Sequence, residues 1–415
     1  MKRFLQIILP CVMCLFGARL VWADSDEMTQ LRRQVQELTT LVQQLNQRLA
    51  AVEQTAEASP GPAPIPAVPV SPQPRASLSA FNPEIGMVAD MVGQLSESSA
   101  DGDGNDKLSV REIELVVGHP IDPYSRFDAT LTFSDIENPD IEEAYITHWG
   151  LPGEMKTKIG RMRPKIGKAS AVHGDVLDTA DEPLVVSKYF GKEGLFRTGV
   201  ELTGFVPAPW TAVTHELTAG LMEGGVGEDG TLFGATRRRP SFYTHLKNFW
   251  DISDASNVEL GTTYLLGSKD ADSDYEVNAL GLDATLVHYV TPSNKLKWQN
   301  EAYFQHRDES VLVEETTTTN LNNTPWGVYS LLDYRLSPRF GVGGRFDYVE
   351  PVDVIPTTLV RDADTAWSSY LTFYQSEFAR WRLQYRHTDF ALGGDDNTVF
   401  VQGTVAIGAH THQLQ

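Results

Sequence analysis

Cysteine is almost missing from this chain. Among 415 residues the two cysteines are Cys11 and Cys14, both near the N-terminus. Lys2 and Arg3 precede an apolar run that leads to Ala23, which is the pattern of a secretory signal peptide over residues 1–23. A membrane anchor is the alternative, but the run is short for a bilayer span. After cleavage, no cysteine would remain for a disulfide, a metal site or a nucleophile.

Long apolar segments, an excess of basic charge and catalytic motifs are also lacking. Without segments long enough for spanning helices, a helical membrane protein is excluded. The formal net charge of −21 argues against a nucleic-acid partner. No G-x-S-x-G motif occurs, and no serine, histidine and acid have the spacing of a triad, so neither an enzyme nor a cofactor is expected.

Residues 24–57 have apolar side chains at spacings of three and four, which predicts an N-terminal α-helical coiled coil. A single amphipathic helix is the alternative; we expect a parallel trimer, since trimeric pores are common. Residues 58–80 are rich in proline and alanine and predict a semi-rigid spacer. This stalk would lie in the periplasm, and contact with peptidoglycan is a further hypothesis. The coiled-coil seam consists of Met28, Leu31, Val35, Leu38, Val42, Leu45, Leu49 and Val52.

Residues 81–415 alternate apolar and polar side chains in segments of about ten residues, separated by alternately short and long gaps. Successive side chains of a strand point to opposite faces, so each segment has one apolar and one polar face. We therefore predict an all-β transmembrane fold, a 16-stranded antiparallel up-and-down outer-membrane β-barrel, with fourteen or eighteen strands as alternatives. The predicted strands are 85–95, 108–118, 125–134, 141–149, 155–163, 196–206, 213–223, 239–250, 256–267, 275–290, 295–307, 325–336, 339–349, 366–376, 380–390 and 397–409.

The two faces of these strands carry different side chains. Aromatic residues near strand ends fit the interfacial girdles of a barrel; they are Trp149, Trp210, Trp250, Trp326, Trp367, Tyr334 and Tyr348. The polar faces of the later strands are mostly basic and those of the earlier strands mostly acidic. This predicts an electric field across the pore, with solvated charges or cross-strand ion pairs as the alternative. The predicted pore-lining basic residues are Lys297, Arg307, Arg335, Arg345, Arg380, Arg382 and Arg386.

The longest gap, residues 163–195, follows the fifth predicted strand, where large porins fold a loop inward. Charged groups at a narrow point set ion selectivity, so we predict a constriction here, with an ordinary outer loop as the alternative. The candidate residues are Lys165, Lys168, His173, Asp175, Asp178, Asp181 and Glu182. A metal site formed by His173 with Asp175 and Asp178 is a weaker alternative.

Two further motifs have weak metal-binding patterns. The segment Asp101–Asp106 has the alternate oxygens of a calcium loop. The acid at the twelfth position, Glu112, already belongs to the next predicted strand, so a solvated hairpin loop is favoured. His410 and His412 share a face of the last strand and are candidate zinc ligands, although a frayed chain end is favoured. The sequence therefore commits to no metal site.

The stretch from Lys107 to Thr203 contains REIEL, PYSRFDATLTFSD, EEAYITHWGLPGEMKTKIGRMRPKIGK and DEPLVV…YFGKEGLFRTGVEL. It resembles the phosphate-selective porin O/P family, including relatives labelled zinc-regulated outer-membrane receptor. The resemblance implies a sixteen-stranded, trimeric outer-membrane channel with an anion preference. Two features depart from that family. The acidic loop around Ser268–Asp274 has a single lysine, Lys269, instead of a lysine cluster, and the chain ends in HTHQLQ without a terminal aromatic residue.

These observations predict a homotrimeric porin in the outer membrane of a Gram-negative-type bacterium, in contact with lipid and with a periplasmic stalk. Small solutes, anions among them, would diffuse passively through its charged constriction. A ligand-specific uptake receptor is one alternative, although residues 24–80 provide no globular plug. A tether between the outer membrane and the cell wall is the other.

Overall fold

The computed structural model describes residues 82–97, 106–134, 139–191, 194–208, 212–223, 232–233, 239–270, 272–313, 317–352 and 358–408. The predicted signal peptide, coiled coil and spacer lie outside these residues. So do His410, His412, Trp210 and residues 101–105 of the acidic segment. These expectations therefore stay predictions.

The described chain is almost entirely β-structure. Its strands are β1 Glu84–Ser96, β2 Asp106–Asp122, β3 Ser125–Phe133, β4 Asp140–His148, β5 Lys156–Met162, β6 Arg197–Phe205, β7 Thr214–Met222, β8 Ser241–Ser253, β9 Ser256–Ser268, β10 Glu276–Thr291, β11 Asn294–Val313, β12 Thr317–Asn323, β13 Trp326–Ser337, β14 Phe340–Val349, β15 Asp364–Ser376, β16 Ala379–Asp389 and β17 Asp395–Gly408. Three short helical turns interrupt them: η2 Pro152–Glu154, η3 Gly174–Val176 and α3 Leu184–Phe190. No described helix is both long enough and apolar enough to cross a membrane.

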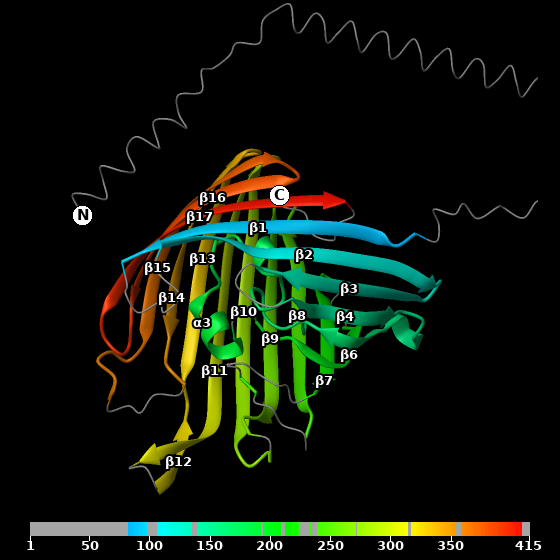
Figure 1. Cartoon of the computed structure of the whole chain (residues 1–415). Helices are drawn as coiled ribbons and strands as arrows, with labels where there is room; N and C mark the ends of the chain where they lie inside the picture. Colours follow the sequence, from blue (N-terminus) through cyan, green and yellow to red (C-terminus); the bar gives the residue numbers. More distant parts are fainter. Residues whose placement is uncertain are drawn as a thin grey trace, which may run out of the picture. The chain divides into compact units, whose positions relative to one another are not determined.

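The strands form a closed antiparallel barrel (Figure 1). Apart from β12, each strand pairs with the next strand of the ring, and β1 pairs with both β2 and β17, which closes the ring. Strand β11 pairs with β13 along Leu296–Phe304, while its far end pairs with β12 along Arg307–Val313. Sixteen of the described strands therefore make the ring, and β12 is a short addition beyond it. The predicted count of sixteen is confirmed, and β12 is an additional strand between the predicted strands 295–307 and 325–336.

Two of the short turns that the sequence predicted contain proline in the structure. Pro123 and Tyr124 join β2 to β3, and Pro292 and Ser293 join β10 to β11. Proline fixes one backbone dihedral near the value that such turns need, so these turns hold the register of the strands on either side. The long β5–β6 connection, by contrast, has room to fold back into the ring.

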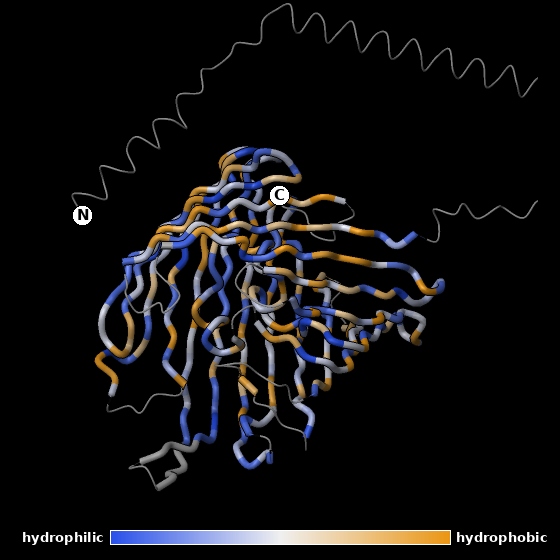
Figure 2. The backbone as a smooth tube through the Cα atoms, viewed as in Figure 1, coloured by the Kyte–Doolittle hydropathy of each residue, from blue (hydrophilic) through white to orange (hydrophobic). Residues whose placement is uncertain are grey.

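Strand β16 shows the two faces of the barrel most clearly. Trp381, Leu383 and Tyr385 are 46%, 45% and 45% exposed on the outside of the ring. Arg380 and Arg382 alternate with them and are buried on the inside. Figure 2 shows the same alternation of apolar and polar residues along many of the strands. An apolar outside is what a lipid-facing surface requires.

The hydrophobic core lies inside the ring. It is built around residues 163–196, the connection from β5 to β6, which we call the inner loop. Val185, Tyr189 and Phe190 of α3 are fully buried there, and α3 packs on β13 and β14 (Figure 1). The strands contribute inward-facing tyrosines to the same cluster, namely Tyr243, Tyr303, Tyr329 and Tyr370. The inner loop therefore folds inward and does not form an ordinary outer loop.

Candidate functional site

The inner loop is held against β14 and β16 by arginines that meet one carboxylate. Asp181 receives Arg345 Nη2 at 3.0 Å and Arg386 Nη1 at 2.7 Å, and it also accepts from the Gln384 amide. Arg345 is completely buried and pairs in addition with Asp347 at 2.7 Å. Burial alone would raise the pKa of Asp181, but the two guanidinium groups outweigh it and hold the pKa well below its ordinary value.

Two further arginines of β16 hold the loop without meeting an acid. Arg382 Nη2 donates to the Leu177 carbonyl at 2.9 Å, and Arg380 donates to the Asp175 carbonyl. Among the described residues neither guanidinium forms an ion pair, whereas Lys297 on β11 pairs with Asp178. The wall formed by β16 therefore carries positive charge that is not fully neutralised.

Inward side chains of other strands accept hydrogen bonds from the loop backbone. The Leu184 amide donates to Asp347 at 3.0 Å and the Ala169 amide donates to Glu301 at 2.9 Å. Glu301 also accepts from the hydroxyls of Tyr303 and Tyr329. Buried carboxylates need such donors, because burying a charge without a partner costs roughly several kcal/mol of folding free energy. The loop backbone thus completes the polar interior of the barrel.

Lysines of the loop face acids of the earlier strands. Lys168 pairs with Glu259 on β9 and lies 3.4 Å from Asp283 on β10. Burial lowers the pKa of Lys168 despite these neighbours. The Lys165 backbone amide donates to Glu201 at 3.2 Å.

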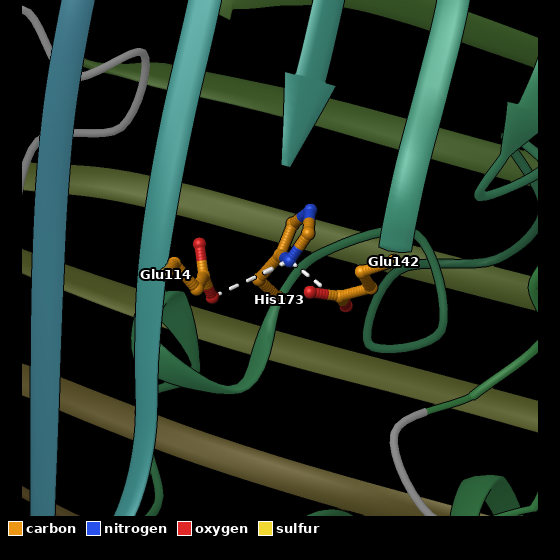
Figure 3. Close-up of side chains that lie close together, drawn as sticks. All are labelled: Glu114, Glu142 and His173. Carbon is orange, nitrogen blue, oxygen red and sulfur yellow. Dashed lines mark ion pairs between the residues drawn. The ribbon is translucent and has the colours of Figure 1, made fainter. Parts of the chain in front are cut away.

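His173 of the inner loop lies among three glutamates of β2 and β4. Its Nδ1 is 3.4 Å from Glu114 Oε1 on β2 and 3.1 Å from Glu142 Oε1 on β4. Figure 3 marks both contacts with dashed lines. Its Nε2 is 3.2 Å from Glu143 Oε2. Burial would lower the pKa of His173, but hydrogen bonds with the three carboxylates outweigh it and raise the pKa well above its ordinary value. The cluster therefore stabilises a positive charge at the imidazole.

Most of the predicted site residues meet in this interior, but two do not. Arg335 stacks over the Tyr374 ring near the β13–β14 turn and donates to the Pro338 carbonyl. Arg307 is buried on β11, where it bonds to Gln305 and Glu309 and makes no described hydrogen bond to the loop. Glu182 contributes its backbone carbonyl, which accepts from Arg345. His173 meets glutamates of β2 and β4, not the Asp175 and Asp178 of the sequence-based alternative.

Sequence reasoning missed Glu142, Glu143 and Arg163. Strict alternation allows only one of two consecutive residues to face inward, yet both glutamates are buried. The register between β3 and β4 shifts at this point, since Thr130 pairs with Glu143 and Leu131 pairs with Ile141. Such a bulge turns an extra residue inward. Two adjacent acids inside an otherwise alternating strand were the available signal.

Comparisons with known proteins support the fold. No protein-family profile matches the chain. An uncharacterized protein of Aquifex aeolicus (strain VF5) is 26% identical over 335 residues, which cover 75% of this chain and 71% of that protein. Among solved structures, the outer membrane channel DcaP of Acinetobacter baumannii matches with a TM-score of 0.51 and 11% identity, over 79% of this chain and 96% of that one. The anion-selective porin from Comamonas acidovorans matches with a TM-score of 0.54 and 8% identity, over 79% of this chain and 99% of that one. The chain shares the barrel fold of these outer-membrane porins.

Proposed function

We propose that this protein is an outer-membrane porin for passive diffusion of small solutes, with a preference for anions. The observation that carries the proposal is a closed sixteen-stranded barrel with an apolar outside and a charged loop folded into its interior. Lipid would cover the outside, and the inner loop would form the constriction. Solved structures with the same fold include an anion-selective porin. We propose the homotrimer and the periplasmic stalk as expectations from the sequence, together with the specific phosphate-selective porin O/P kinship.

The anion preference rests on the wall formed by β16. Arg380 and Arg382 donate to backbone carbonyls and neutral side chains of described residues, so their charge acts on the lumen. A fixed positive charge raises the local concentration of anions. The negative charge of Asp181, in contrast, is offset by Arg345 and Arg386, which both pair with it.

Planar-bilayer recording of the purified, folded protein under a KCl gradient tests the proposal. We expect discrete current steps and a reversal potential of the sign set by chloride. In the double variant Arg380→Gln/Arg382→Gln, the reversal potential should shift toward the equilibrium potential of potassium. Its matched control, Arg339→Gln/Arg361→Gln, removes two charges from exposed connections and should shift it less. Folded barrels that give no current would overturn the porin proposal. An equal shift in both double variants would overturn only the proposal that Arg380 and Arg382 set the anion preference.

A further inference from the structure

The cluster around His173 is assembled from three separate parts of the chain. Glu114 comes from β2, Glu142 and Glu143 from the bulge of β4, and His173 from the inner loop just before η3 (Figure 3). All four are buried, with exposed fractions of 2%, 4%, 8% and 5% in that order. Neither the porin fold nor the proposed selectivity requires this arrangement.

The spacing of the cluster fits ligands around one metal ion. The ligand atoms of Glu114, Glu142 and His173 all lie within 4.8 Å of one another. The distances of 3.4 and 3.1 Å from His173 Nδ1 to the two carboxylates exceed the roughly 2.7–2.9 Å typical of an ionic hydrogen bond. Two tetrahedral ligands with bonds of about 2.0–2.1 Å to a zinc ion would lie about 3.4 Å apart. The distances from His173 Nδ1 to the two carboxylates are therefore close to the distances expected between ligand atoms of one zinc ion.

The surrounding contacts orient the candidate ligands. His173 Nε2 faces Glu143 Oε2 at 3.2 Å and can donate to it, while Nδ1 is the ring atom that faces Glu114 and Glu142. Glu143 is itself fixed, because its other oxygen accepts from the Arg163 amide at 2.8 Å. The Arg163 side chain holds Glu142 at 2.9 Å. Metal-binding histidines usually have such a carboxylate on the second nitrogen.

Buried carboxylate oxygens without a hydrogen-bond partner among the described residues are an observation independent of the spacing. Glu142 Oε2 has no hydrogen-bond partner among the described residues. Asp175, two residues after His173, is 1% exposed, and neither of its carboxylate oxygens accepts a hydrogen bond from the part of the chain that the structure describes. Its charge acts on Glu114, so it lies near the same cluster. Burying unpaired carboxylate oxygen is costly, and a divalent cation would offset that cost.

We propose that this cluster binds one divalent transition-metal ion, with His173 Nδ1 and the carboxylates of Glu114 and Glu142 as ligands and Glu143 as the positioning residue. One imidazole with carboxylates suits zinc or manganese better than calcium, which prefers oxygen ligands alone. The bound ion would join the inner loop to β2 and β4, whereas Arg345 and Arg386 hold the loop from β14 and β16. It therefore fixes the loop independently of those arginines.

Metal binding by the folded full-length mature protein tests this proposal. The protein is stripped with a chelator in detergent and titrated with Zn²⁺ by calorimetry, and metal content is measured by mass spectrometry. We expect about one ion per chain, with binding lost in His173→Gln and in Glu114→Gln. The matched control is His245→Gln, because His245 is also buried but faces a single carboxylate, Asp283 at 3.9 Å. It should bind like the parent.

Two additions keep the result unambiguous. All measurements are repeated in a His410→Gln/His412→Gln background, so that the C-terminal histidines contribute no zinc. Glu143→Gln should weaken Zn²⁺ binding by about 10–100-fold and leave the stoichiometry unchanged, as loss of an outer-sphere partner does. Co²⁺ added to the parent protein should give visible absorption bands that Zn²⁺ displaces, a readout that needs no variant.

The proposal is overturned if the folded parent in the His410→Gln/His412→Gln background binds no Zn²⁺ and shows no Co²⁺ bands. That result would leave a protonated imidazole as the charge between the carboxylates. It is also overturned if His173→Gln, folded as judged by heat-modifiable gel mobility, binds Zn²⁺ as tightly as His245→Gln. Neither outcome depends on whether the barrel conducts, so the porin proposal stands or falls separately.

Discussion

Arg386 on β16 and Asp181 in the inner loop form an ion pair of 2.7 Å across 205 positions of sequence. The same carboxylate also meets Arg345 on β14. Asp181 therefore fixes the loop to two strands at once. Replacing it tests both its charge in the pore and its role in holding the loop in place.

Asp181→Asn should increase anion selectivity and destabilise the docked loop. The change leaves Arg345 with Asp347 alone and leaves Arg386 without a described acid, so the free energy of unfolding should fall by about 1–3 kcal/mol. Reversal potentials and urea unfolding measure the two effects. Asp254→Asn makes the same charge change in an exposed turn and should alter neither. Equal behaviour of the two variants would contradict this role of Asp181.

The contribution of Asp181 should persist at moderately acid pH. Its pKa is held below the ordinary value of about 3.9. A carboxyl with a lowered folded pKa stabilises fully above its unfolded pKa and loses that effect as the pH falls through the folded pKa. The difference in unfolding free energy between the parent and Asp181→Asn should therefore stay constant from pH 7 to about 5. Urea titrations across this range measure it, and a difference that disappears by about pH 5 would count against the ion pairs.

Gly167→Ala should prevent the inner loop from docking. Gly167 has a φ of +59°, and an added Cβ would lie 1.8 Å from Glu301 Oε1. Gly153→Ala is the matched control, since its φ is +74° but no atom lies within 4 Å of the added Cβ. The control should cost about 1–2 kcal/mol from backbone strain, and Gly167→Ala should cost more. Limited proteolysis and urea unfolding compare them; similar losses in both would show that the contact with Glu301 is unimportant.

The outer face should respond to charge according to depth in the bilayer. Leu282 and Leu336 are 45% and 44% exposed, but Leu282 lies in the middle of β10 and Leu336 lies next to the end of β13. Leu282→Arg should destabilise the barrel in liposomes by about 2–4 kcal/mol, and Leu336→Arg by about 0–1 kcal/mol. Unfolding from liposomes measures both values. A water-soluble barrel would show no such dependence on position.

The strands were predictable from sequence because the alternation of side chains is a local property. Trp381 and Leu383 could be assigned to the outside of β16, and Arg382 to the inside, without any knowledge of neighbours. The partners of the inner loop were not predictable in this way, since sequence spacing does not determine which distant side chain faces His173. The bulge at Glu142 left only a weak signal, two adjacent acids, because a single extra residue changes the register without producing a regular pattern. Local periodicity thus defines the barrel, while its interior depends on long-range pairing.

The order of synthesis gives the inner loop a late place in folding. Ala180 and Asp181 are made about two hundred residues before Gln384 and Arg386, which hold them. Contacts between such distant residues form slowly, because a long chain segment must close first. Until β14 and β16 join the barrel, the charged groups of the loop remain solvated and open to protease. Protection of the inner loop from cleavage should therefore report that the last strands have been assembled.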